Sequence, residues 1–215
     1  MRRSPSVRWH AGCIPETDAD VKSPFPPPLG LSTERLVLLP AQPALAPAWL
    51  EYYQRNRAHF APTDPVHPPD FYTLGFAESA LARMAAGAIA GDQVSFALTW
   101  REVPDRIIGT CRFTQIARGA FQSCMLGYGI DADCQGQGLM TEALRAAIAH
   151  MFDARRLHRI QANHLPENER SARVLQRLGF VREGLAPRYL FIAGAWRDHV
   201  LNALINPRFD DAWLV

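Results

Sequence analysis

The sequence is poor in cysteine. Its 215 residues include only Cys13, Cys111, Cys124 and Cys134, which form no C-x-x-C pair and no cysteine–histidine cluster at zinc spacing. We therefore expect reduced thiols, no metal site and a cytoplasmic protein.

Long apolar runs are absent as well. No stretch approaches the roughly 18 consecutive apolar residues that a transmembrane helix needs. The basic N-terminus is not followed by an apolar segment long enough for a secretory signal. The sequence therefore predicts no membrane partner.

The sequence also lacks an excess of either charge. Arginine and lysine total 23, aspartate and glutamate total 21, and the formal net charge is +2. This balance does not call for a nucleic acid or an anionic membrane as partner. The hydrophobic fraction of 48% is enough for one sizeable folded domain.

Composition divides the chain into three parts. Residues 1–30 contain six prolines and no sustained periodicity, which predicts an extended or disordered leader. We expect a folded domain over residues 31–208 and a short C-terminal tail over residues 209–215.

Hydrophobic periodicity predicts an α+β fold with helices packed on a sheet. The expected strands are residues 33–40, 94–100, 106–114, 123–130, 159–163, 189–192 and 196–205. The expected helices are residues 49–60, 71–90, 141–152 and 169–178. Turn residues between the strands of residues 94–130 favour an antiparallel meander.

The stretch "DCQGQGLMTEAL" of residues 133–144 places two glycines just before a predicted helix. A helix start presents unpaired N–H groups and the positive end of the helix dipole, which favours binding of a phosphate close to the backbone. The alternative is a tight strand-to-helix turn that binds nothing.

Other phosphate-binding motifs fit this stretch less well. Thr141 stands where a dinucleotide fingerprint needs its third glycine, and residues 157–162 lack the acid expected about 20 residues later. The Gly-Lys-Ser/Thr of a Walker loop is also missing.

Three stretches together resemble the GNAT superfamily of N-acetyltransferases, in particular its RimJ/RimL-type ribosomal-protein alanine branch. They are "GYGIDADCQGQGLMTEAL", "RIQANHLPENERSARVLQRLGF" and "YLFIAGAWRDHV". The resemblance runs over residues 33–207 and implies a mixed, mostly antiparallel sheet in three layers, splayed between its fourth and fifth strands. It also implies acetyl-CoA as the cofactor, with no metal.

The resemblance further implies which residues hold acetyl-CoA. The pyrophosphate would bind to backbone amides of the glycine loop and helix start, and the end of the fourth strand would offer a backbone N–H to the thioester carbonyl. Met140 stands where a small residue is usual. The residues concerned are Ile130, Gln135, Gly136, Gln137, Gly138, Leu139, Met140 and Thr141.

Ser171 and Asn168, at the start of the helix predicted over residues 169–178, have two interpretations each. Many relatives protonate the leaving thiolate with a tyrosine, which aligns here with Leu175, so the resemblance assigns a catalytic donor role to Ser171 instead. Asn168 would bind the pantetheine arm. Either residue could simply cap the helix that follows.

The general base is left open. An α-amine has a reference pKa of roughly 8, so about a tenth of it is neutral at pH 7 and only a modest base or a water chain is needed. The candidates by residue type are Asp131, Asp133, His164, Glu183 and His199.

The sequence thus favours an acyltransferase that transfers acetyl from acetyl-CoA to a primary amine, foremost the N-terminal alanine of a ribosomal protein. Residues 59–70, which contain four prolines, would then border the acceptor groove and control acceptor choice. The alternatives are a small-molecule amine as acceptor, or a non-catalytic ribosome- or RNA-associated module. No direct nucleic-acid contact is expected for the enzyme, which would be a monomer or homodimer.

Overall fold

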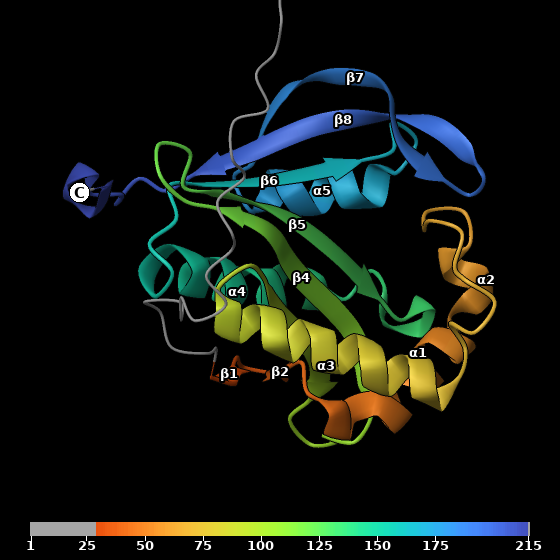
Figure 1. The fold of residues 1–215 in the computed structure, drawn as a ribbon. Helices are drawn as coiled ribbons and strands as arrows, with labels where there is room; N and C mark the ends of the chain where they lie inside the picture. The colour runs from red at the N-terminus through yellow and green to blue at the C-terminus, as the bar shows by residue number, and fades with distance from the viewer. Residues whose placement is uncertain (1–28, 215) are drawn as a thin grey trace, which may run out of the picture.

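The sheet of the computed structural model, which describes residues 29–214, has eight strands in the order β1-β2-β3-β4-β5-β6-β8-β7 (Figure 1). The bounds are Leu31–Ser32 (β1), Leu36–Pro40 (β2), Val94–Trp100 (β3), Ile107–Ala117 (β4), Ser123–Ile130 (β5), Arg159–His164 (β6), Val181–Ile192 (β7) and Ala195–Ile205 (β8). The predicted leader lies outside the described residues except for residues 29–30, and the domain bounds at 31 and 208 stay a prediction.

The α-helices cover both faces of this sheet. Their bounds are Ala46–Arg55 (α1), Arg57–Phe60 (α2), Leu74–Ala90 (α3), Leu139–Asp153 (α4) and Glu169–Arg177 (α5). Short 3-10 turns occupy Pro43–Leu45 (η1), Ala132–Cys134 (η2) and Asp211–Leu214 (η3). The predicted α+β class, with helices flanking a mixed sheet in layers, is confirmed (Figure 1).

All neighbouring strands pair antiparallel except β5 and β6, which pair parallel. The β5–β6 ladder covers only Ser123–Met125 against Arg159–Gln161, whereas β5 stays paired to β4 as far as Ile130. Residues 126–130 of β5 therefore have no partner on the β6 side. This is the predicted splay between the fourth and fifth long strands.

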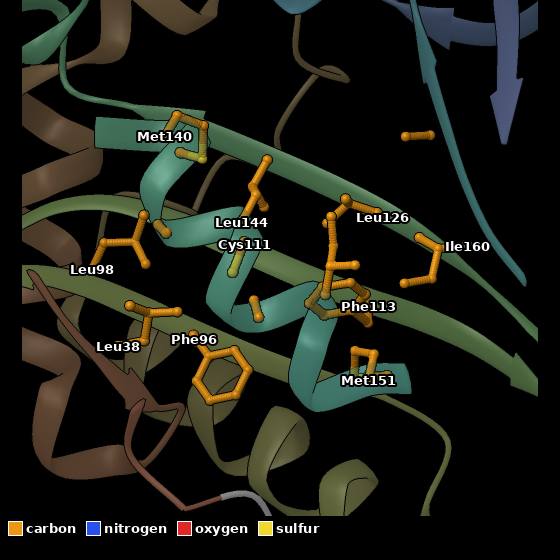
Figure 2. Packing of buried hydrophobic residues seen from close by; sticks show 14 of the residues in the cluster. Leu38, Phe96, Leu98, Cys111, Phe113, Leu126, Met140, Leu144, Met151 and Ile160 are labelled. Carbon is orange, nitrogen blue, oxygen red and sulfur yellow. The ribbon is translucent and has the colours of Figure 1, made fainter. Parts of the chain in front are cut away.

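The core consists of two apolar layers on opposite faces of the sheet. On one face, α4 and α5 pack against strand residues such as Phe96 and Phe113, and Figure 2 shows Leu144 and Met151 of α4 among the strand side chains of this cluster. On the other face, α1, α2 and α3 form a second cluster around Tyr52. Alternation along each strand produces the two layers, because successive side chains point to opposite faces.

The structure corrects the predicted start of the penultimate strand. β7 begins at Val181 rather than at residue 189, and its pairing to β8 shifts register twice, between Arg182 and Gly184 and between Ala186 and Leu190. Gly184 and Pro187 suppress the strand pattern in the sequence, but both are tolerated because β7 is an edge strand.

A smaller correction concerns a helix. The helix predicted over residues 49–60 starts at Ala46 and breaks at Asn56, whose side-chain amide donates to the carbonyl of Tyr52 at 2.9 Å. The pairing of β4 with β5 shifts register between Thr114 and Ala117. The remaining predicted strands and helices are confirmed to within a few residues at their ends.

Candidate active site

The loop between β5 and α4 turns through two residues that need to be glycine. Gly136 and Gly138 have φ angles of 76° and 77°, in the left-handed region that disfavours side chains. A Cβ added at Gly136 would meet nothing within 4 Å, so its backbone conformation, rather than lack of space, calls for glycine.

The predicted helix start leaves its amides unpaired. Glu142 is the first residue of α4 whose N–H donates to the carbonyl of Gly138, at 3.0 Å, and no acceptor among the described residues takes the N–H groups of residues 136–141. These N–H groups lie at the positive end of the α4 dipole, where an anion is stabilised. The Thr141 hydroxyl is also buried without a partner in the described chain, so a ligand that donates or accepts there fits the site.

Met140, which departs from the usual small residue, has a structural explanation. Its side chain is 5% exposed and packs into the core cluster beneath the loop (Figure 2). The large side chain therefore points away from the exposed side of Gly136 and Gly138 and does not obstruct the amides.

A carboxylate on α4 fixes the loop from one side. Glu142 accepts from the Thr33 hydroxyl at 2.6 Å, from the Arg35 backbone N–H at 2.9 Å and from Arg35 Nε at 2.7 Å. Arg35 also donates to the carbonyl of Gln137 at 3.1 Å. Burial would raise the pKa of Glu142, but these hydrogen bonds outweigh it and lower the pKa below its ordinary value.

A second anchor holds the loop from the other side. Asp131, whose side chain is 1% exposed, accepts from Arg55 Nε at 2.9 Å and from Arg106 Nη2 at 3.2 Å. Burial opposes its ionisation, but the two arginines lower the pKa of Asp131 below its ordinary 3.8. Asn56 adds a hydrogen bond from the Ala132 N–H at 3.0 Å.

The α2 helix reaches the glycine loop directly. His59 Nε2 lies 2.8 Å from Gln135 Nε2, so a residue of the predicted acceptor segment contacts the predicted cofactor loop. A Cβ at Gly129 would lie 3.4 Å from both Phe60 and the Tyr52 hydroxyl, so side chains of α1 and α2 pack against the end of β5.

Asn168 and Ser171 lie at the start of α5, on the open side of β5. Asn168 Oδ1 accepts from the Ser171 N–H at 3.0 Å, so Asn168 is the N-cap of α5. The Ser171 hydroxyl lies 2.7 Å from the hydroxyl of Tyr128 on β5. Sequence reasoning missed Tyr128, because only the fold brings these two residues together.

The five candidate bases differ in burial and in hydrogen-bond partners. Asp131 is engaged with two arginines and Glu183 with Arg159. Asp133 is exposed, whereas His164 and His199 are buried and each uses Nδ1 toward a backbone oxygen, at 2.8 and 3.1 Å. No hydrogen bond joins any of the five side chains to Ser171 within residues 29–214.

The segment after α2 is tied to the β7–β8 hairpin. The N–H of Ala193, in the hairpin turn, donates to the carbonyl of Asp64 at 3.0 Å. His67 stacks on Phe71 with ring centroids 3.6 Å apart and lies 3.4 Å from the Asp64 carboxylate. In Figure 1 the hairpin extends over the α2 segment, so these two parts of the chain border the same region.

Three features together define an acetyltransferase of the GNAT class. They are the splayed parallel strands, the helix start with unpaired N–H groups and the turn that contains two glycines. Residues 35–181 match the family model described as an acetyltransferase (GNAT) domain, and the chain belongs to this family. The cofactor of the family is acetyl-CoA, as predicted.

Several relatives fall within one branch of the family. The chain is 41% identical over 182 residues to the [ribosomal protein uS5]-alanine N-acetyltransferase of Escherichia coli K12, covering 84% of this chain and 93% of that enzyme. The ribosomal-protein-S5-alanine acetyltransferase of Vibrio fischeri superposes with a TM-score of 0.81 at 34% identity, over 85% of this chain and all of that one. RimJ of Mycobacterium smegmatis, solved with CoA-disulfide, superposes with a TM-score of 0.77 at 30% identity, over 83% and 88%.

The described residues also bear on metal ions and on membranes as possible partners. Among residues 29–214, no group of three or more His, Cys, Asp or Glu side chains is arranged to hold a metal ion. No helix in this same range has the length and hydropathy to cross a membrane.

A substitution in the glycine loop tests its backbone. We expect Gly136→Ala to weaken acetyl-CoA binding about tenfold, because an alanine in the left-handed region costs about 1–2 kcal/mol and displaces the neighbouring amides. Gly119→Ala is the matched control, since Gly119 also has positive φ and free space but lies in the β4–β5 turn. Calorimetry with acetyl-CoA measures both; equal affinity losses in the two variants would contradict the assignment.

The Asp131 anchor predicts a pH-dependent stability. Asp131→Asn should lower the free energy of unfolding by roughly 2 kcal/mol near neutral pH, because two arginines lose their carboxylate. The pKa of Asp131 is depressed, so wild type keeps this advantage above 3.8 and loses it as the pH falls through the lower folded value. Urea unfolding of both proteins over acidic pH measures the gap; a gap that widens on acidification would contradict the anchor.

Proposed function

We propose that this protein acetylates the N-terminal alanine of ribosomal protein uS5, and that it does so in the cytoplasm. The observation that carries the proposal is the coincidence of a GNAT domain match over residues 35–181 with 41% identity, over most of both chains, to an enzyme of that activity. Whether the protein acts as a monomer or a homodimer stays a prediction.

In this proposal the cofactor phosphates bind at the start of α4. The amides of Gln135, Gly136, Gln137, Gly138, Leu139, Met140 and Thr141 receive the pyrophosphate. The Gln135 N–H also donates to the Ala132 carbonyl at 3.4 Å, whereas the unpaired N–H groups of residues 136–141 and the α4 dipole neutralise the phosphate charge without a metal. Arg35 and Asp131 act through the loop, since each fixes its backbone from outside the amide cradle.

The acetyl end of the cofactor lies in the splay. The unpaired side of β5, ending at Ile130, offers backbone groups to the pantetheine amides and to the thioester oxygen. Asn168 borders the pantetheine arm while capping α5. Because β6 diverges after Met125, the cofactor replaces a strand that would otherwise pair there.

The reaction itself demands little acid–base help from the protein. The amine nitrogen attacks the thioester carbonyl carbon, the carbon–sulfur bond breaks, and the electron pair leaves with sulfur. An α-amine is neutral in about a tenth of molecules at pH 7, whereas a lysine amine is neutral in fewer than about one in a thousand. An N-terminal amine therefore needs little help from a base, in keeping with the finding that none of the five base candidates hydrogen-bonds Ser171 within residues 29–214.

Turnover of a uS5 peptide tests the proposal. Incubation with acetyl-CoA should release free CoA and add one acetyl group to a peptide that begins with the alanine of uS5, as seen by mass spectrometry. The same peptide with a blocked N-terminus is the control and should stay unmodified. Faster turnover of polyamines or amino acids than of every peptide would overturn the proposal in favour of a small-molecule acceptor.

The segment after α2 should govern the acceptor. Replacing residues 65–68, two of which are prolines that pre-set its shape, with a Gly-Ser stretch should raise the peptide KM several-fold and leave the acetyl-CoA KM unchanged. His59→Ala is the contrasting variant, because His59 contacts Gln135 and its loss should affect acetyl-CoA. Steady-state kinetics with each substrate varied decides, and equal losses for both substrates in the loop variant would count against acceptor control.

A further inference from the structure

A tyrosine on the open strand reaches across the splay to the start of α5. The Tyr128 hydroxyl lies 2.7 Å from Ser171 Oγ and 3.3 Å from the Ser171 carbonyl oxygen, although the residues are 43 positions apart. No other hydrogen bond joins β5 to α5 among the described residues. The pair therefore spans the gap that opens where β6 leaves β5.

The phenol keeps its proton in this position. Burial raises the pKa of Tyr128 to about 12, only partly opposed by its hydrogen bond to Ser171. A phenol is a stronger acid than an aliphatic alcohol and therefore the better donor of the two hydroxyls. If Tyr128 donates to Ser171 Oγ, the one hydrogen of the serine hydroxyl is left to point at another acceptor.

The position that supplies a tyrosine in many relatives cannot supply one here. Leu175, on α5, is 1% exposed and belongs to the hydrophobic core. Tyr128 brings a phenol to the same gap from β5, and this phenol contacts Ser171. The chain thus places a phenol and a serine hydroxyl within hydrogen-bond distance of each other at this gap.

We propose that Tyr128 is a positioning residue that donates to Ser171 Oγ and so aims the serine hydrogen at the departing CoA sulfur. The inference rests on the proposed acetyl transfer. Ser171 is the catalytic residue, because it contacts the reacting sulfur, and Tyr128 acts through it. Two linked donors polarise one another, which strengthens the second hydrogen bond.

No proton needs to move along this pair. A thiol with an ordinary pKa near 8.5 is a far stronger acid than Tyr128, so its thiolate does not remove the phenol proton. The carbon–sulfur electron pair stays on sulfur, stabilised by the Ser171 hydrogen bond. The amine proton leaves to solvent or a base, and sulfur later takes a proton from water according to the pH.

The pKa of the CoA thiol bound to the protein tests the inference directly. Ultraviolet titration of the complex with free CoA measures thiolate formation and needs no acceptor. We expect a thiol pKa below that of free CoA in wild type, and a value closer to free CoA in both Tyr128→Phe and Ser171→Ala. The double variant should match Ser171→Ala, because the two groups act as one unit.

Kinetics supply the second readout. Tyr128→Phe keeps the ring and should lower kcat about tenfold, the effect of one weakened hydrogen bond, with the acetyl-CoA KM unchanged. Tyr53→Phe is the matched control, because burial also raises the pKa of Tyr53 to about 12 but it lies on α1, and it should leave kcat and the thiol pKa at wild-type values.

Two results would overturn the role of Tyr128. One is a wild-type thiol pKa in Tyr128→Phe together with a raised value in Ser171→Ala, and the other is an unchanged thiol pKa in both variants. A wild-type protein that binds CoA but leaves the uS5 peptide unmodified would refute the proposed acceptor alone. The thiol titration still decides on Tyr128 in that case, since it uses CoA and no peptide.

Discussion

The parting of β5 from β6 is the constraint on which the rest of the site depends. Three residues of parallel pairing hold the two strands together, and beyond Met125 the β5 backbone loses its partner on that side. Unpaired backbone in the middle of a sheet is costly unless something satisfies it. The same parting opens the space that Tyr128 and Ser171 bridge, and it sets where the following glycine loop begins.

The glycine loop combines exposed amides with a rigid foundation. Residues 135–138 carry no charged side chain, so the electrostatics there come from the helix dipole and from two ion-paired anchors, Arg35 with Glu142 and Asp131 with its arginines. Both carboxylates are fully engaged by donors and therefore do not repel an incoming phosphate at full strength. The anchors hold the amides in position before any ligand arrives, which lowers the entropy lost on binding.

Sequence patterns predicted the local features of the site well and its long-range contacts poorly. The glycine turn and α4 follow from neighbouring residues, because backbone conformation and helical periodicity are local properties. Glu142 meets Arg35 across 107 positions, and Tyr128 meets Ser171 across 43, so only the folded sheet reveals these pairs. The sequence pattern hides the first part of β7, because Gly184 and Pro187 are typical loop residues. The edge position of β7 in the sheet tolerates both.

The backbone hydrogen bond from the Ala193 N–H to the Asp64 carbonyl links two segments that lie 129 positions apart. Such a bond requires both turns to keep their length, since a residue inserted in one would pull its N–H or carbonyl out of reach. The lengths of the hairpin tip and of the segment after α2 are therefore coupled. A graft of either turn onto another scaffold would need the other turn as well to keep this hydrogen bond.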